Sequence, residues 1–148
     1  MEHLGRRTLF VISEVVMCIS MFTLGTFFYL KENAENDNST ITSLGWIPLF
    51  SLILFIAAFG IGAGPVPWTM CSELLPPNIK GPGVSIATFS NWILAFIVTK
   101  TFVNMQEALT SAGAFWMFGS FCVFGTLFGL FLLPETKGKT PEEIQAVM

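Results

Sequence analysis

The chain has 148 residues, of which 53% are hydrophobic and only 11% are charged, and its mean hydropathy is +0.69. Soluble domains carry roughly a quarter charged residues, so this composition excludes an ordinary water-soluble domain and favours a protein surrounded by lipid. The net charge of −3 and the scattered positions of the seven Lys and Arg residues exclude a nucleic-acid-binding surface.

Four apolar stretches are long enough to cross a lipid bilayer. A transmembrane helix needs about 20 predominantly apolar residues, and the sequence offers such runs at 8–30, 44–71, 84–103 and 112–133. None of them shows the alternation of apolar and polar residues that is typical of barrel strands. We therefore predict an all-α integral membrane protein with four transmembrane helices.

Polar or Pro- and Gly-rich stretches separate these runs. We predict connectors at 31–43, 72–83 and 104–111 and a charged tail at 134–148. Four spans place both termini and the middle connector on one side of the membrane. That side carries five basic residues, which are Arg6, Arg7, Lys80, Lys137 and Lys139, against Lys31 and Lys100 on the other. The excess of positive charge predicts a multi-pass protein with both termini in the cytoplasm.

The first connector contains a glycosylation sequon, Asn38-Ser39-Thr40, on the side predicted to face outward. Asn-X-Ser/Thr sites are modified only on that side of the membrane, so the sequon agrees with the predicted orientation. We accordingly predict a glycoprotein of the plasma membrane that is modified at Asn38.

The second span contains a helix-breaking string, GPVPW, at 64–68, preceded by two more glycines. Pro65 and Pro67 lack backbone donors and clash with the preceding helical turn, while Gly64 allows the backbone to bend. Broken helices are tolerated inside membranes where they line a cavity or are covered by protein. A kinked structural helix is the simpler alternative, in which Gly60 and Gly64 form a packing face.

Four motifs occur in the order found in one transporter family. They are Gly5-Arg6-Arg7, the GPVPW string with its Glu73-Leu74-Leu75-Pro76 exit, Asn91-Trp92, and Pro134-Glu135-Thr136-Lys137-Gly138. The sequence resembles the sugar porters of the major facilitator superfamily, and within them the facilitated trehalose transporter-like proteins of insects. The resemblance covers essentially the whole chain and implies helices nine to twelve, in the C-terminal half of a twelve-helix fold. It also implies that residues 1–148 are a fragment, with the eight N-terminal helices of the carrier missing.

The resemblance implies a sugar site built partly from Trp68, Asn91 and Trp92. An amide supplies both a donor and an acceptor for sugar hydroxyls, and indole rings supply flat surfaces for the apolar faces of the sugar. Packing of the tryptophans and an interhelical hydrogen bond from Asn91 are the simpler alternatives. Many glucose transporters have Glu where this chain has Gly60, so their monosaccharide specificity does not transfer. The helix break at Gly64, Pro65 and Pro67 would serve gating.

The resemblance also implies a cytoplasmic charge gate. In the family, charges at the inner ends of the helices hold the two halves of the carrier together and separate when it opens inward. The matching residues here are Arg6, Arg7, Glu73, Lys80 and Glu135. Lys80 replaces the usual Arg and lacks its two-pronged geometry, so the gate should be looser. Ordinary positive-inside topology explains the basic residues but not the two acids.

Glu14 is the one acid well inside a predicted span. Ionisable groups within membranes are costly to bury and usually functional. We favour a structural partner role for Glu14 over a proton relay.

Enzymatic function is not expected from this sequence. It has one His, His3, three cysteines without a CxxC pair, and no nucleophile–base pair, phosphate loop or metal-ligand cluster. We therefore predict no catalytic residue, no metal site and no cofactor.

Two functions remain open. The first is transport of a hexose or trehalose-like disaccharide by alternating access, as facilitated uniport or proton symport, with the lipid bilayer and the rest of the carrier as partners. The alternative is a non-transporting scaffold or partner subunit that associates through Gly60–Gly64 or Gly125–Gly129.

Overall fold

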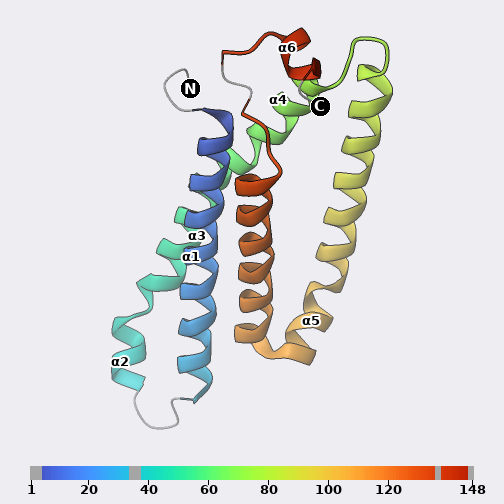
Figure 1. Cartoon of the computed structure of the whole chain (residues 1–148). Helices are drawn as coiled ribbons and strands as arrows, with labels where there is room; N and C mark the ends of the chain where they lie inside the picture. Colours follow the sequence, from blue (N-terminus) through green and yellow to red (C-terminus); the bar gives the residue numbers. More distant parts are fainter. Residues whose placement is uncertain (1–4, 34–37, 136–137, 147–148) are drawn as a thin grey trace.

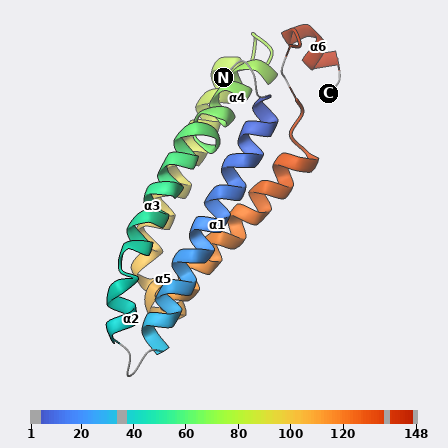
Figure 2. The same ribbon diagram turned by 90° about the vertical axis from the view of Figure 1, so that its left-hand side faces the viewer.

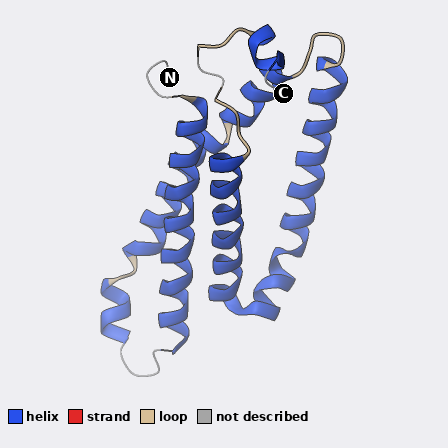
Figure 3. Ribbon diagram, viewed as in Figure 1, coloured by secondary structure: helices blue, strands red, loops and turns tan. Residues whose placement is uncertain are grey.

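A computed structural model describes residues 5–33, 38–135 and 138–146, and every regular element within these ranges is helical (Figures 1 and 3). The elements are α1 (Arg6–Asn33), α2 (Asn38–Ser43), α3 (Trp46–Ala58), the π-helical turn η1 (Phe59–Ala63), α4 (Pro65–Leu74), α5 (Lys80–Phe131) and α6 (Pro141–Ala146). Three stretches are long and apolar enough to cross a membrane: 6–33, 46–74 and 80–131.

The third stretch, α5, contains the third and fourth predicted spans. An unbroken helix of 52 residues would measure about 78 Å, more than twice the ~30 Å hydrocarbon core. The helix is broken at Thr110, whose φ of 64° and ψ of 167° are not helical. The chain reverses there, so that α5 has two arms, and the second arm runs alongside α1 (Figures 1 and 2). The predicted connector at 104–111 contains this reversal, although residues 104–109 and 111 are helical and only Thr110 leaves the helical conformation.

The second stretch is broken where the sequence places its glycines and prolines. The amide of Gly64 donates to the carbonyl of Phe59 at 2.8 Å, a bond that spans five residues and defines a π-helical turn. Pro65 then begins α4, a position where its missing N–H leaves no helical bond unmade. The predicted break is thus one wide turn followed by a new helix start.

Other connectors are shorter than predicted. Residues 31–33 extend α1, and 38–43 form α2, so much of the first predicted loop is helical. Leu75 ends α4 in an extended conformation, as expected for a residue before proline. In the tail, Thr140 and Glu143 form a reciprocal capping box at the start of α6, with N···O distances of 3.0 and 3.3 Å.

Helix α1 is the centre of the bundle. It packs against both α5 and the α3–η1 segment, and it supplies eight buried residues. A small cluster of Phe10, Val66 and Met70 joins α1 to α4. Large apolar side chains cover most of the outer surface, as expected for helices in contact with lipid or with further helices.

Candidate functional site

Three of the five predicted gate residues meet at one end of the bundle. Arg6 begins α1 and forms an ion pair with Glu73, in the last turn of α4. The backbone amide of Arg6 also donates to Oε1 of Glu135 at 3.1 Å. A Cβ atom on Gly5 would collide with the Glu135 carboxylate, so a side chain at this position would displace the flexible end of Glu135. The start of α1 is therefore held by two carboxylates, one at the end of α4 and one in the segment after α5.

Arg7 has different partners. Its Nε atom donates to the carbonyl oxygen of Gly129 at 3.2 Å, and its Nη2 atom donates to that of Leu130. These carbonyls lie in the last turn of α5, where helical partners are missing and the helix dipole is negative. Arg7 thus caps the second arm of α5 and does not pair with an acid in the described ranges. Lys80 is exposed at the start of α5 and forms no ion pair with any residue that the structure describes.

The predicted sugar-binding residues lie on the outside of the described bundle. Trp68 on α4 is 40% exposed and Trp92 on the first arm of α5 is 68% exposed, and Asn91 is exposed next to it. They do not line the cavity described below. Asn38 begins α2, but its side chain, Glu2, His3 and the central part of the 134–138 motif fall outside the described residues.

The glycine that matters most in the broken helix is Gly62, which the sequence reasoning did not single out. A Cβ atom at Gly62 would lie 2.7 Å from the carbonyl oxygen of Leu9 and would collide with Ser13, so η1 crosses α1 at backbone distance. Nothing lies within 4 Å of a Cβ atom at Gly60. The motif indicated that glycine is needed in this segment. Which of its glycines contacts α1 depends on the π turn, because that turn sets the direction in which each glycine faces.

The second glycine pair of the scaffold hypothesis faces inward. Cβ atoms on Gly125 and Gly129 would lie 2.8 Å from Glu14 and from Phe10, respectively, both of which are on α1. This pair therefore serves contacts within the chain and is not available as a surface for a separate partner.

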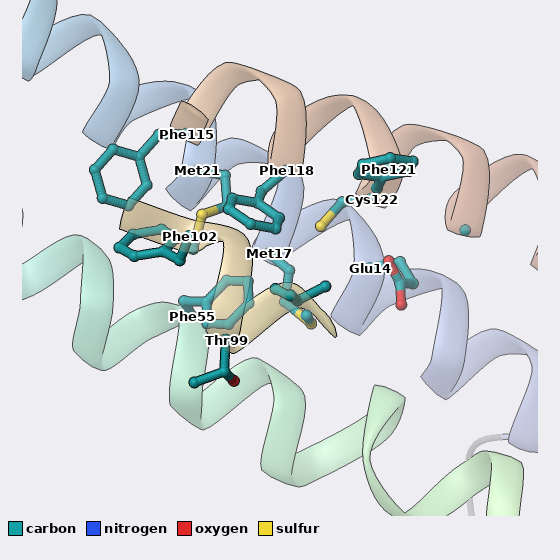
Figure 4. A pocket seen from close by; sticks show the side chains of 12 residues that line it. Glu14, Met17, Met21, Phe55, Thr99, Phe102, Phe115, Phe118, Phe121 and Cys122 are labelled. Carbon is teal, nitrogen blue, oxygen red and sulfur yellow. The ribbon is translucent and has the colours of Figure 1, made fainter. Parts of the chain in front are cut away.

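A cavity of about 630 Å³ lies between α1, α3 and the two arms of α5 (Figure 4). Its lining consists of Glu14, Met17, Met21, Phe55, Val98, Thr99, Phe102, Phe115, Phe118, Phe121, Cys122 and Gly125. Figure 4 shows the Glu14 carboxylate and the Cys122 thiol at one end and the rings of Phe102, Phe115 and Phe118 at the other. The spacing of phenylalanines at 115, 118 and 121 was a helical-face signal that the sequence reasoning passed over.

The chain was also compared with known protein families, curated proteins and solved structures. A family model described as "Sugar (and other) transporter" matches residues 1–148. The chain belongs to the sugar transporter family. The resemblance inferred from the motifs is confirmed at this level, and so is the expectation that the chain is not an enzyme, because the matched proteins are transporters.

Individual relatives of this family member are found among insects. Over 147 residues it is 48% identical to the facilitated trehalose transporter Tret1 of Polypedilum vanderplanki and 45% identical to that of Anopheles gambiae. These matches cover 99% of this chain but only 28% and 18% of the two relatives.

The fold is also similar to that of a solved structure. The proton:xylose symporter XylE bound to 6-bromo-6-deoxy-D-glucose matches with a TM-score of 0.82 at 32% identity, over 99% of this chain and 30% of that chain. The chain thus spans less than a third of the length of these relatives.

Proposed function

We propose that this membrane protein carries out sugar transport as the part of a carrier that contains helices nine to twelve of the twelve-helix major facilitator fold. The observation that carries the proposal is the match of 99% of the chain to one segment of a sugar symporter, at a TM-score of 0.82. In this proposal the two arms of α5 are separate membrane spans, which gives four spans in all. Both termini lie in the cytoplasm of a plasma-membrane protein, and Asn38 lies outside.

The substrate is a hexose or a trehalose-like disaccharide, moved by alternating access together with the remaining helices of the carrier. Trp68, Asn91 and Trp92 would contact the sugar. Their exposure on the described bundle supports this, because a site shared with further helices must lie on the outer surface of these four spans. The relatives include both facilitated transporters and a proton symporter, so both modes belong to the proposal.

The inner charge cluster would hold the carrier closed to the cytoplasm. The Arg6–Glu73 ion pair and the contact from Arg6 to Glu135 tie α1, α4 and the segment after α5 together. Arg7 would keep the second arm of α5 fixed to α1 during the cycle, since its bonds to backbone carbonyls need no partner from the rest of the carrier. Lys80 is exposed and remains free to pair with a group outside the described residues.

Sugar uptake tests this proposal. The chain is produced together with the portion of the Polypedilum vanderplanki transporter that it does not match, and trehalose and glucose uptake are measured in proteoliposomes. We expect uptake only when both parts are present. Asn91→Ala should raise the half-saturating sugar concentration about 3- to 10-fold, the effect of losing one or two hydrogen bonds to the sugar.

Asn104→Ala is the matched control, because Asn104 is an exposed amide on the same arm of α5. It should leave the half-saturating concentration unchanged. Equal uptake by the Asn91 and Asn104 variants would remove Asn91 from the sugar site, and absence of uptake from the two parts together would count against the carrier function. Alkalinisation of the medium during uptake would identify proton symport.

A further inference from the structure

The tail after α5 contains a threonine in a sequence context that occurs once in the chain. Eight prolines are present, and only Pro141 directly follows a hydroxyl-bearing residue, Thr140. Thr140 lies beyond the end of α5 and immediately before α6 (Figure 1). A threonine followed by proline is the substrate pattern of proline-directed protein kinases, which accept a residue without a backbone N–H at this position. The dipeptide is therefore a candidate modification site.

Thr140 is accessible to an approaching enzyme. Its side chain is exposed, as are Lys139 before it and Glu142 and Glu143 after it. Residues 138–140 are not helical, and α6 itself has only six residues. Helices of fewer than about 12 residues are marginal in water, so the start of α6 can unwind into the extended form that a kinase cleft accepts.

The Thr140 hydroxyl also differs in its hydrogen bonding from most hydroxyls of the long helices. Those of Thr23 and Thr88, for example, donate to the carbonyl four residues earlier at 2.8 Å. The Thr140 hydroxyl instead accepts a hydrogen bond from the amide of Glu143 at 3.3 Å, and within the described residues it donates to no acceptor. Its proton is therefore available to a catalytic base.

We propose that Thr140 is a phosphorylation site for a proline-directed protein kinase, and that the phosphate releases α6 from α4. The proposal rests on the proposed function for its topology, in which this tail lies in the cytoplasm with ATP and such kinases. The Thr140 hydroxyl oxygen forms a bond to the γ-phosphorus of ATP, and the bond from that phosphorus to the bridging oxygen of ADP breaks. The hydroxyl proton passes to the catalytic carboxylate of the kinase and then to water.

A phosphate at this position is incompatible with the capping box. The box holds the Glu143 carboxylate 3.0 Å from the Thr140 amide and the Glu143 amide 3.3 Å from the Thr140 hydroxyl oxygen. A phosphate on that oxygen adds a charge of about −1.5 to −2 beside Glu143, with Glu142 in the same turn. The sequence of α6, PEEIQA, has no basic residue to balance these charges. Like-charge repulsion therefore turns the Glu143 carboxylate away, and the Thr140 amide loses its partner.

Opening of the capping box affects the bundle through α4. The short helix α6 lies against α4, whose last turn carries Glu73, the partner of Arg6. A six-residue helix that loses its cap has little left to keep it folded. Phosphorylation should therefore detach α6 and uncover part of the segment that carries the Arg6–Glu73 ion pair.

A kinase assay tests the site on the full chain in lipid nanodiscs, which leave both membrane faces accessible. The chain is incubated with ATP, Mg²⁺ and an active mitogen-activated protein kinase, and mass spectrometry of its peptides locates the phosphate. We expect phosphate on Thr140. Thr140→Val should abolish it, and Pro141→Ala should slow its addition about 10- to 200-fold, the effect of losing one apolar contact in an enzyme pocket. Thr136→Val is the matched control, since Thr136 precedes Lys137 and not proline, and it should behave like the unmodified chain.

Hydrogen exchange measures the release of α6. Backbone amides at 143–146 should exchange about 2- to 30-fold faster in the phosphorylated chain, which is the effect expected from losing an N-cap. Amides of α1 serve as the internal reference and should not change. Glu143→Gln separates charge from shape, because the neutral amide oxygen still accepts a hydrogen bond from Thr140. In this variant phosphorylation should accelerate the exchange of α6 less.

Different results would overturn each part of the proposal. Absence of phosphate on Thr140, or equal phosphorylation of the Pro141→Ala variant, would overturn the kinase site. Phosphate on Thr140 with unchanged or slower exchange of α6 would overturn the release. Neither assay involves sugar or depends on membrane orientation, so a failure here with intact sugar uptake would remove only this proposal. Phosphorylation and release without uptake would remove only the carrier role.

Discussion

The two arms of α5 have similar apolar character but different surroundings. Every buried residue of α5 lies in the second arm, at Ala112, Ala114, Gly119 and Gly129, and the first arm has none. Small side chains explain the difference, because helices in a membrane associate where their backbones approach closely. Apolarity alone therefore indicates that a helix enters the membrane, while small residues on one face indicate which helix it packs against.

The largest expected effect comes from substituting two glycines of α5, one in each arm. A Cβ atom at Gly129 would lie 2.8 Å from the ring of Phe10, whereas at Gly81 it would meet nothing within 4 Å. We expect Gly129→Ala to destabilise the fold by about 1–3 kcal/mol through overpacking. Gly81→Ala should be neutral or stabilising by up to about 1 kcal/mol. Unfolding in mild detergent, followed by circular dichroism, measures both, and equal effects would refute the role of close packing.

The residue that separates the arms provides the next test. Thr110 has a backbone conformation that is essentially restricted to glycine, and strain of this kind costs about 1–3 kcal/mol. Its hydroxyl accepts a weak bond from the amide of Gly113 at 3.4 Å, which offsets little of that cost. Thr110→Gly should therefore stabilise the fold by about 1–2 kcal/mol.

Thr101→Gly is the control for Thr110→Gly, since Thr101 is helical and its replacement should destabilise by about 0.5–1 kcal/mol. The same unfolding measurement in detergent compares the two variants. A loss of stability in Thr110→Gly would show that the reversal is not strained.

The weakest expected effect concerns the direct contact between the arms. Phe102 and Phe118 lie with their ring centroids 6.1 Å apart across the cavity, at a tilt of 31°. A double-mutant cycle with leucine at both positions should give a coupling energy of about 0.5–1 kcal/mol. A coupling near zero would mean that this ring pair does not help to hold the two arms together.

The sequence was sufficient for the helical, apolar character of the chain, the position of the helix break and the family, because each depends on local composition or on a motif. It did not reveal that Arg7 binds backbone carbonyls instead of an acid, since that depends on how far α1 is shifted along α5. The helical continuation through residues 104–109 was also missed, because a short polar segment between two apolar stretches is compatible with either a helix or a loop.

Gly62 and the cavity illustrate a further limit. Which of several neighbouring glycines contacts α1 is decided by the direction each faces, and that direction follows from tertiary packing. Glu14 was identified from the sequence as an acid inside a span, with a structural partner favoured over a proton relay. The structure adds that its α5 neighbour is Gly125, which offers no side chain to the Glu14 carboxylate.

The π-helical turn at Phe59–Ala63 has a consequence for the direction of Trp68. One additional residue in a helical turn rotates everything that follows by about 100° about the helix axis. The side chains of α4 are therefore rotated about the helix axis, compared with their directions in a continuous α-helix that begins at Trp46. If the turn tightened to an ordinary α-helical one, the indole of Trp68 would swing by about a quarter of a revolution while its depth in the membrane changed by only ~1.5 Å.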